Sequence, residues 1–330
     1  MIKLDLILPY RYGEAEIKEP IVDETISIGH TLNLASDISI NFAVKTTLLA
    51  DYVNHHMVVE IPVYEGNTQI DTRTLTIEPV LNGNYYYYTL TGLTAVNMGD
   101  VVSAQLHMEK DGQEYLSKVD TYSVSQYAYS QLNKEGTPEK LKALCADLLR
   151  YGKEAQIYKS YRTDSLADAS MTEENKAYLS DVEAVAFGNT NKTLTDLESP
   201  QITWAGKSLI LDSKVCLKFI FSASKYSGSV DGLTLRVSYT DTYGAEKALT
   251  LADPELYNEK LGYYAFTFDS LLAAELRSVV SVQVYAGDAP VSYTLQYSAD
   301  TYGNNKTGTL LELCKALFAY SDSARAYFIP

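Results

Sequence analysis

The sequence predicts an α+β protein that is mostly β, built as two tandem copies of a β-sandwich-like unit, each followed by a C-terminal helical segment. Three observations carry this prediction. Apolar and polar residues alternate along many short segments, and these segments recur in the same order in both halves of the 330-residue chain. Each series also ends in a stretch with the apolar spacing of a helix.

The first repeated strand runs over residues 31–44 and returns over residues 208–221. The apolar pairs, first copy before second, are Leu32 and Leu209, Leu34 and Leu211, Ile38 and Val215, Ile40 and Leu217, Phe42 and Phe219, and Val44 and Phe221. An alternation that is kept at every apolar position is what a strand with one buried face requires.

Three more strands follow in the same order in each half. Residues 59–63 correspond to 233–237, residues 85–90 to 263–268, and VVSAQL at 101–106 to VVSVQV at 279–284. The matching order of strands with the same apolar parity predicts a duplicated unit.

Each series ends in a predicted helix. Residues 141–158 and 310–327 share apolar residues at positions i, i+3, i+4 and i+7, which places them on one helix face. Thr137 in the first half, and Thr309 with Glu312 in the second, are candidate caps. A shorter helix is expected over about 123–132, and its counterpart near 297–305 is expected to be shorter or broken because of Gly303 and the asparagines after it.

The predicted domain organisation follows from the repeat. Residues 1–161 form the first β-sandwich plus helix, and residues 182–330 form the second. Residues 162–181 have no counterpart in the second half and are interpreted as a linker with a short helix after Thr172.

The composition excludes some partners. The formal net charge of −15 repels phosphate backbones and anionic lipid headgroups, so we expect no nucleic acid partner and no membrane insertion. No apolar run is long enough to span a bilayer. No secretory signal pattern precedes the first strand, so we expect either a cytoplasmic protein or an excised piece of a larger exported chain.

Catalytic motifs are absent from the sequence, which lacks GxSxG, a P-loop, HExxH and an EF-hand loop. His55 and His56 are adjacent, cannot chelate one ion together from a strand, and are expected in a surface turn. Cys145 and Cys314 occupy equivalent helix positions and are interpreted as small buried hydrophobic residues. Cys216 interrupts the apolar alternation of its strand, and its parity points it outward. We therefore expect no enzyme, no disulfide, no metal and no cofactor.

Tyrosine is unusually abundant, with 28 residues against one tryptophan. In the run at 85–88, the parity of Tyr86 and Tyr88 matches large residues in the second copy and predicts the core, whereas Tyr85 and Tyr87 point outward. The same reasoning places Tyr64 outward. Tyr64, Tyr85 and Tyr87 are therefore the candidate binding residues. The alternative is that a neighbouring helix or the other domain covers them.

Three stretches carry a family resemblance. Residues 122–133 (YSVSQYAYSQLN), 141–172 and 196–209 (DLESPQITWAGKSL) resemble repeat modules of large secreted or cell-surface proteins of anaerobic gram-positive gut bacteria. The resemblance implies a non-catalytic module beside enzymes or adhesive regions, located outside the cell. Some similar proteins bind host immunoglobulins as B-cell superantigens.

Together these observations favour an extracellular protein-binding module, with a host protein such as immunoglobulin as a concrete candidate. A carbohydrate-binding module is the first alternative, although glycans stack most often on exposed tryptophan, and the single Trp204 aligns with a strand position that looks buried. The second alternative is a structural spacer in a multidomain surface protein.

Overall fold

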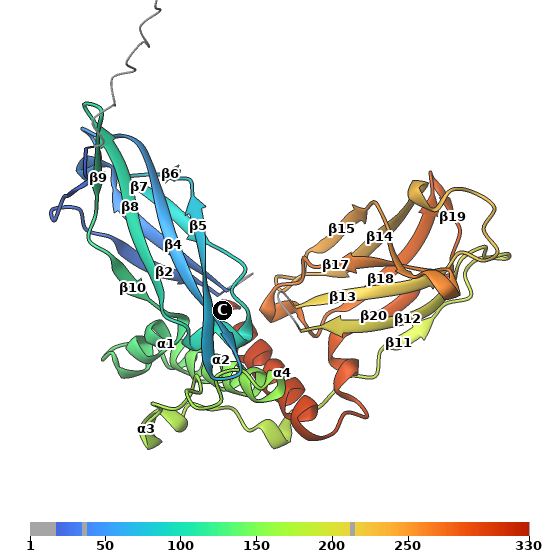
Figure 1. The fold of residues 1–330 in the computed structure, drawn as a ribbon. Helices are drawn as coiled ribbons and strands as arrows, with labels where there is room; N and C mark the ends of the chain where they lie inside the picture. The colour runs from blue at the N-terminus through green and yellow to red at the C-terminus, as the bar shows by residue number, and fades with distance from the viewer. Residues whose placement is uncertain (1–17, 35–37, 212–214, 330) are drawn as a thin grey trace, which may run out of the picture.

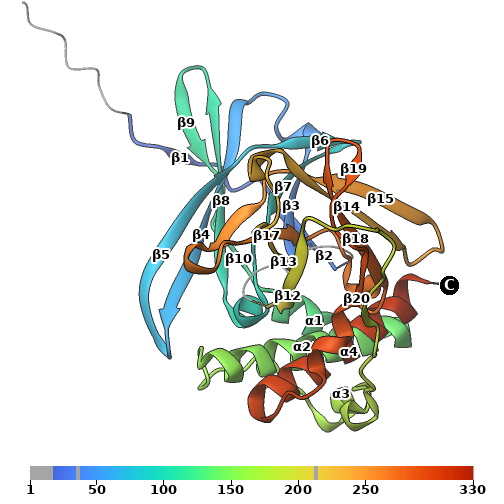
Figure 2. The same ribbon diagram turned by 90° about the vertical axis from the view of Figure 1, so that its right-hand side faces the viewer.

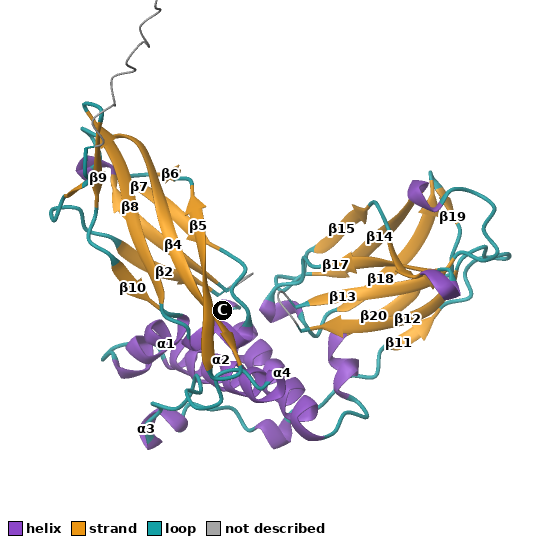
Figure 3. Cartoon of the chain, in the orientation of Figure 1, coloured by secondary structure: helices purple, strands orange, loops and turns teal. Residues whose placement is uncertain are grey.

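The computed structural model describes residues 18–34, 38–211 and 215–329, so the start of the first predicted unit lies outside the described residues. The chain is mostly β, as predicted, with several sheets and a long C-terminal helix (Figures 1 and 3). Within the described residues, none of the helices is both long and apolar enough to cross a membrane.

The first half forms two sheets. One has the strand order β1-β9-β8-β4-β5, with β10 also paired to β8, and the other has the order β2-β3-β7-β6. Their bounds are β1 Ile21–Val22, β2 Gly29–Asn33, β3 Ser39–Lys45, β4 Val53–Glu65, β5 Thr68–Ile77, β6 Val80–Asn82, β7 Tyr85–Leu90, β8 Val102–Lys110, β9 Gln113–Leu116 and β10 Asp120–Tyr122.

The second half also forms two sheets. One has the order β11-β20-β18-β14-β15, with β19 paired to β18, and the other has the order β12-β13-β17-β16. Their bounds are β11 Asn191–Thr193, β12 Thr203–Ile210, β13 Cys216–Ser222, β14 Leu233–Thr240, β15 Glu246–Leu251, β16 Glu255–Asn258, β17 Tyr263–Phe268, β18 Val279–Ala286, β19 Ala289–Pro290 and β20 Leu295–Ser298.

The stretches 31–44 and 208–221, each predicted as a single strand, contain parts of two antiparallel strands, β2 with β3 and β12 with β13. The alternation still predicts the buried faces of these strands correctly. Phe42 on β3 pairs with Tyr88 on β7, and both side chains are fully buried. Phe219 on β13 pairs with Phe266 on β17 in the second half, and both are buried there. Tyr86 is half-buried and packs against the same core, so the predicted inward parity of the tyrosine run is confirmed.

Four α-helices complete the described chain: α1 Val124–Asn133, α2 Glu139–Lys159, α3 Glu173–Lys176 and α4 Gly308–Phe328. The hydroxyl of Ser123 accepts a bond from the amide of Gln126 and begins α1, and Thr172 begins α3 through a capping box with Asn175. The counterpart of α1 in the second half is only a 3-10 turn, Ala299–Gly303, as expected.

Two of the predicted helix caps are wrong. The hydroxyl of Thr137 has no hydrogen-bond partner within the described chain, and α2 begins after Pro138. Thr309 lies inside α4, which begins one residue earlier. Both helices pack along their length in the core, and this packing stabilises them without a side-chain cap.

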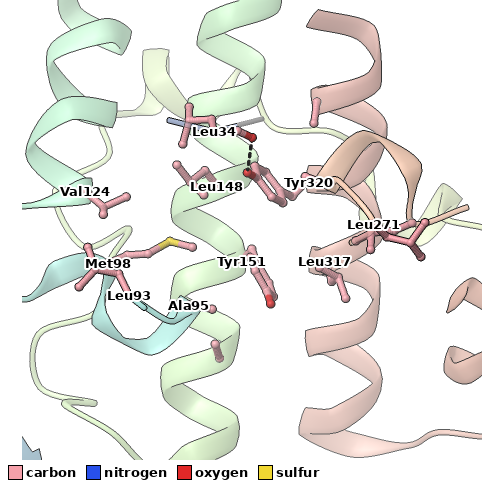
Figure 4. Close-up of a cluster of buried hydrophobic side chains, with 14 of the residues drawn as sticks. Leu34, Leu93, Ala95, Met98, Val124, Leu148, Tyr151, Leu271, Leu317 and Tyr320 are labelled. Atoms are coloured by element: carbon pink, nitrogen blue, oxygen red, sulfur yellow. Dashed lines mark hydrogen bonds between the residues drawn. The ribbon is translucent and has the colours of Figure 1, made fainter. Parts of the chain in front are cut away.

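Helices α2 and α4 pack directly against each other and run in opposite directions (Figure 4). The rings of Tyr151 and Tyr320 stack with centroids 5.8 Å apart and planes 11° apart. The hydroxyl of Tyr320 donates to the carbonyl oxygen of Leu34 over 3.5 Å, which ties α4 to the first half. The two halves therefore meet through the apolar helix faces that the sequence predicted to be buried, and their core is continuous.

Candidate functional site

Tyr85 and Tyr87 lie together on the outer face of the sheet β2-β3-β7-β6. Their ring centroids are 6.1 Å apart, and both side chains are half-buried. They alternate with Tyr86 and the fully buried Tyr88 along β7, so strand geometry forces them to the side away from the core. The predicted outward direction of Tyr85 and Tyr87 is confirmed.

Cross-strand register places Tyr87 in a row of small or apolar residues. Ala43 lies opposite Tyr87 on β3, and Gly29 lies opposite Ala43 on β2. On the other side Val80 lies opposite Tyr87 on the edge strand β6, with 65% of its surface exposed. We call Gly29, Ala43, Tyr87 and Val80 the Tyr87 row. Because glycine and alanine stand on one side of the tyrosine, no bulky cross-strand neighbour covers that side of the ring.

The row beside the Tyr87 row is more polar. Lys45 lies opposite Tyr85 on β3, and Asn82 lies opposite it on β6. Lys45 is exposed and brings a positive charge to a chain that is otherwise strongly acidic. An apolar row with a polar border is the composition of a protein contact patch.

Tyr64 does not belong to this surface, which corrects the predicted three-residue cluster. It lies on β4, in the other sheet of the first half, so its outer face is on a different side of the sandwich from that of Tyr85 and Tyr87. The edge of its ring contacts Tyr161 with centroids 5.8 Å apart, and the guanidinium of Arg162 lies 4.5 Å from its ring centroid. Strand parity gave its outward direction correctly, but pairing between strands decides which sheet a residue occupies.

A shallow hollow of about 230 Å³ lies beside Tyr64 on that second face. Its lining includes Glu60, Pro62, Ser103 and Arg162. Arg162 is already bound to the buried carboxylate of Asp100, with the atoms Nη1 and Oδ1 2.7 Å apart. Because its guanidinium is engaged both there and on the ring of Tyr64, the arginine fastens the β4–β5 hairpin to the segment after α2.

The corresponding outer face in the second half is buried at its centre. Ile220 and Ala265, which pair across β13 and β17, are both buried although they point away from the core. Lys218 and Glu255 form an ion pair 2.6 Å long on the same face, and the ammonium of Lys218 lies 5.8 Å from the ring centroid of Tyr257. Tyr257 on β16 keeps 51% of its surface exposed, but the positions that match Ala43 and Tyr87 are buried, so the row around Tyr87 has no open counterpart in the second half.

Buried carboxylates elsewhere are all bonded to structural partners. Asp147 on α2 is bonded to Arg150, to the amide and hydroxyl of Ser180, and to the hydroxyl of Ser323 on α4. This cluster joins α2, the segment 162–181 and α4. Among the described residues, no group of three or more histidine, cysteine or acidic side chains could hold a metal ion.

The histidine pair lies in strand β4, so the expected surface turn is wrong. Its two members do point to opposite faces, as strand geometry requires. The Nδ1 atom of His55 lies 2.8 Å from the hydroxyl of the buried Tyr88, and the ring of His56 stacks on His107 with centroids 5.3 Å apart. Burial lowers the pKa of His55, which favours a neutral ring whose Nδ1 accepts a hydrogen bond from the hydroxyl of Tyr88.

None of the three cysteines forms a disulfide in the described chain, and all three are buried. Burial raises the pKa of Cys145 to about 12 and that of Cys314 to about 11, so neither is a thiolate near neutral pH. These values suit the predicted role as small buried hydrophobic residues. Cys216 is also buried, although strand parity had pointed it outward.

The comparisons with known proteins give no family. No family model matches the chain, and no curated protein matches it either. A solved structure named Br derivative BhCBM56 aligns at 17% identity over 30% of this chain and 90% of its own, with a TM-score of 0.21. A GH family 64 laminaripentaose-producing β-1,3-glucanase from Paenibacillus barengoltzii aligns at 6% identity over 78% of this chain, also with a TM-score of 0.21.

The chain spans about half the length of that glucanase, 47% in one structure and 53% in its complex with laminarihexaose. All of these TM-scores are far below the level at which two chains share a fold. The three structures therefore do not bear on the ligand of this chain, and its function has to be inferred from its own surfaces.

Proposed function

We propose that the chain is a non-catalytic binding module of an exported cell-surface protein, and that its first half contacts a protein partner through Tyr85 and the Tyr87 row. The observation that carries this proposal is the open row itself, in which Gly29 and Ala43 leave one side of the Tyr87 ring without a bulky neighbour. Tyrosine offers both a rigid ring and a hydroxyl at low entropic cost, and it recurs at binding hot spots.

The charge distribution favours a neutral or basic partner. The chain carries a net charge of −15, which repels acidic proteins at long range. Lys45 at the border of the surface offers a partner one local cationic contact. Immunoglobulin is the first partner to test, because the sequence resembles surface proteins of which some bind host antibody.

The two halves are proposed as copies of one unit, over residues 1–161 and 182–330 with 162–181 as linker. The shared strand orders support this reading, since β2-β3-β7-β6 parallels β12-β13-β17-β16 and β8-β4-β5 parallels β18-β14-β15. A duplicated unit whose copies differ on one outer face fits a function that belongs to the first copy alone.

The test compares two variants of the whole chain. The double change Tyr85→Ser and Tyr87→Ser removes the aromatic surface, and Tyr263→Ser makes the matched change at a half-buried tyrosine on β17 in the second half. Both are measured for melting and for binding to purified immunoglobulin and to proteins recovered from serum. Loss of one anchor costs about 2 kcal/mol or more, which is roughly a thirtyfold loss of affinity.

Two outcomes would count against the proposal. If the double variant binds with undiminished affinity, this surface is not the binding site. If Tyr263→Ser loses as much affinity as the double variant, the site lies in the second half. Glycan binding on an array, with no serum protein recovered, would favour the carbohydrate-binding alternative. In that case Trp204 is a poor platform, because its indole donates to the carbonyl of Tyr293 over 2.8 Å and packs on Phe219. Binding to neither leaves the spacer function.

A further inference from the structure

Strand β5 is a long, open sheet edge. It runs over Thr68–Ile77, ends the strand order of its sheet, and pairs only with β4 among the described residues. Eight of its ten residues are exposed, including all seven from Thr68 to Thr74. Figure 2 shows β5 at the left margin of the first sandwich, with no described element beyond it. An edge of this length presents a row of backbone groups that another strand can pair. One of them is already bonded within the chain, since the amide of Thr72 donates to the carboxylate of Asp71 over 2.8 Å, and a partner strand has to replace that bond.

Two opposite charges lie near the middle of this edge. Asp71 and Arg73 flank Thr72 and are both exposed. Arg73 pairs with the buried Ile61 on β4, so it stands on the core-facing side of the sheet, although it is itself exposed. A charge on that side normally blocks edge pairing, because a foreign strand would place an apolar residue against it.

A second copy of the same strand removes this obstacle. In an antiparallel pair with a twofold axis at Thr72, Arg73 of each copy lies directly opposite Asp71 of the other. The two cross-strand pairs are then both of opposite charge, which stabilises an antiparallel ladder. Thr72 meets Thr72 and Thr74 meets Ile70, so β-branched residues face each other on the outer side.

The same charges select the register. A shift that moves the axis to Asp71 places the two Asp71 carboxylates opposite each other, and a shift to Arg73 does the same for the two guanidiniums. Like charges directly opposite each other destabilise a strand pair. A pairing centred on Thr72 is therefore favoured over pairings centred on Asp71 or on Arg73.

The equivalent edge in the second half lacks these features. Strand β15 is six residues long, against ten for β5. Its Lys247 is held in an ion pair with Asp241, 3.1 Å long. A short edge that carries lysine is one that resists pairing.

We propose that two copies of this chain pair through β5, antiparallel and centred on Thr72, to form a twofold dimer with a sheet continuous across both molecules. The contact is isologous, so it closes at two copies. A single pair of strands buries less surface than a standard stable interface, so the expected dissociation constant is about 1 µM or weaker. Many copies on one cell surface would strengthen such a contact through their high local concentration.

Charge variants of the whole chain test the pairing by sedimentation at rising concentration. Arg73→Asp alone and Asp71→Arg alone should each be monomeric, because each faces its own copy with like charges. An equimolar mixture of the two should dimerise, because the acidic positions of one then face the basic positions of the other. The matched control Lys247→Asp, on the β15 edge, should dimerise as the unchanged chain does.

A cross-link tests the register. Thr72→Cys places two thiols opposite each other at the axis, within reach of a disulfide, whereas Thr74→Cys leaves its thiols several residues apart. Mild oxidation should therefore link the first variant and leave the second as monomer; the native cysteines are buried and do not interfere. An unchanged chain that is monomeric up to ~1 mM, dimers that survive Arg73→Asp, or linkage of Thr74→Cys in place of Thr72→Cys would each overturn the proposal.

Discussion

Removing the carboxylate of Asp147 should loosen the contact between the two halves of the molecule. Its side chain is fully buried and bonded to Arg150, to Ser180 in the segment between α3 and β11, and to Ser323 on α4. The distances to the amide and the hydroxyl of Ser180 are 3.1 Å and 2.5 Å. The substitution Asp147→Asn keeps the shape of the side chain and removes its charge, so it leaves the guanidinium of Arg150 without a countercharge.

The expected cost follows from these contacts. A hydrogen bond to a charged group contributes about 1.5–3 kcal/mol, and four such bonds meet at this carboxylate. The desolvation of two buried charges offsets much of that sum, and breaking a buried ion pair from one side costs about 3–5 kcal/mol. If the chain unfolds as one unit, this corresponds to a fall of about 4–7 °C in Tm.

Chemical denaturation and hydrogen exchange along α4 measure this effect. Glu139→Gln, at an exposed position in the first turn of the same helix, is the control and should cost less than about 1 kcal/mol. The pair Asp147→Leu with Arg150→Leu should recover only part of the stability, because it removes both buried charges but leaves the donors of Ser180 and Ser323 without their acceptor. A loss below about 1 kcal/mol for Asp147→Asn, with unchanged exchange in α4, would refute the reasoning.

Three further predictions concern single residues. Burial raises the pKa of Cys145 to about 12, so it should react with a thiol reagent at pH 8 only after denaturant is added, and fast labelling of the folded chain would contradict the helix assignment. Burial holds the pKa of His55 in the folded chain below its ordinary value of 6.5. The contribution of His55 to stability is therefore present above pH 6.5 and is lost as the pH falls through the folded pKa. His55→Gln should remove this fall from the plot of unfolding free energy against pH. A methyl group at Gly152 in α2 would lie 2.7 Å from the sulfur of Met98, so Gly152→Ala should cost about 1–3 kcal/mol despite its better helix propensity, and a rise in Tm would contradict the close packing.

Much of the secondary structure could be predicted from the sequence, because it depends on local periodicity. Alternation along a strand separates its two faces, so the buried positions of Phe42 and Tyr88 and the outward positions of Tyr85 and Tyr87 follow without knowing any partner strand. The spacing of apolar residues in α2 and α4 gave the buried helix faces for the same reason. The caps at Thr137 and Thr309 failed because packing sets where those helices begin.

Only the tertiary structure decided which of these faces come together. The alternation along each strand places both Tyr64 and Tyr87 on an outer face. Strand pairing nevertheless assigns them to different sheets. Local periodicity does not reveal this pairing, because it joins residues that are far apart in the chain. The Tyr87 row consists of residues from four strands, so no local pattern contains it. The stacking of Tyr151 on Tyr320 and the bonds around Asp147 likewise join separate halves, because periodicity reports which side of an element is buried and not what it is buried against.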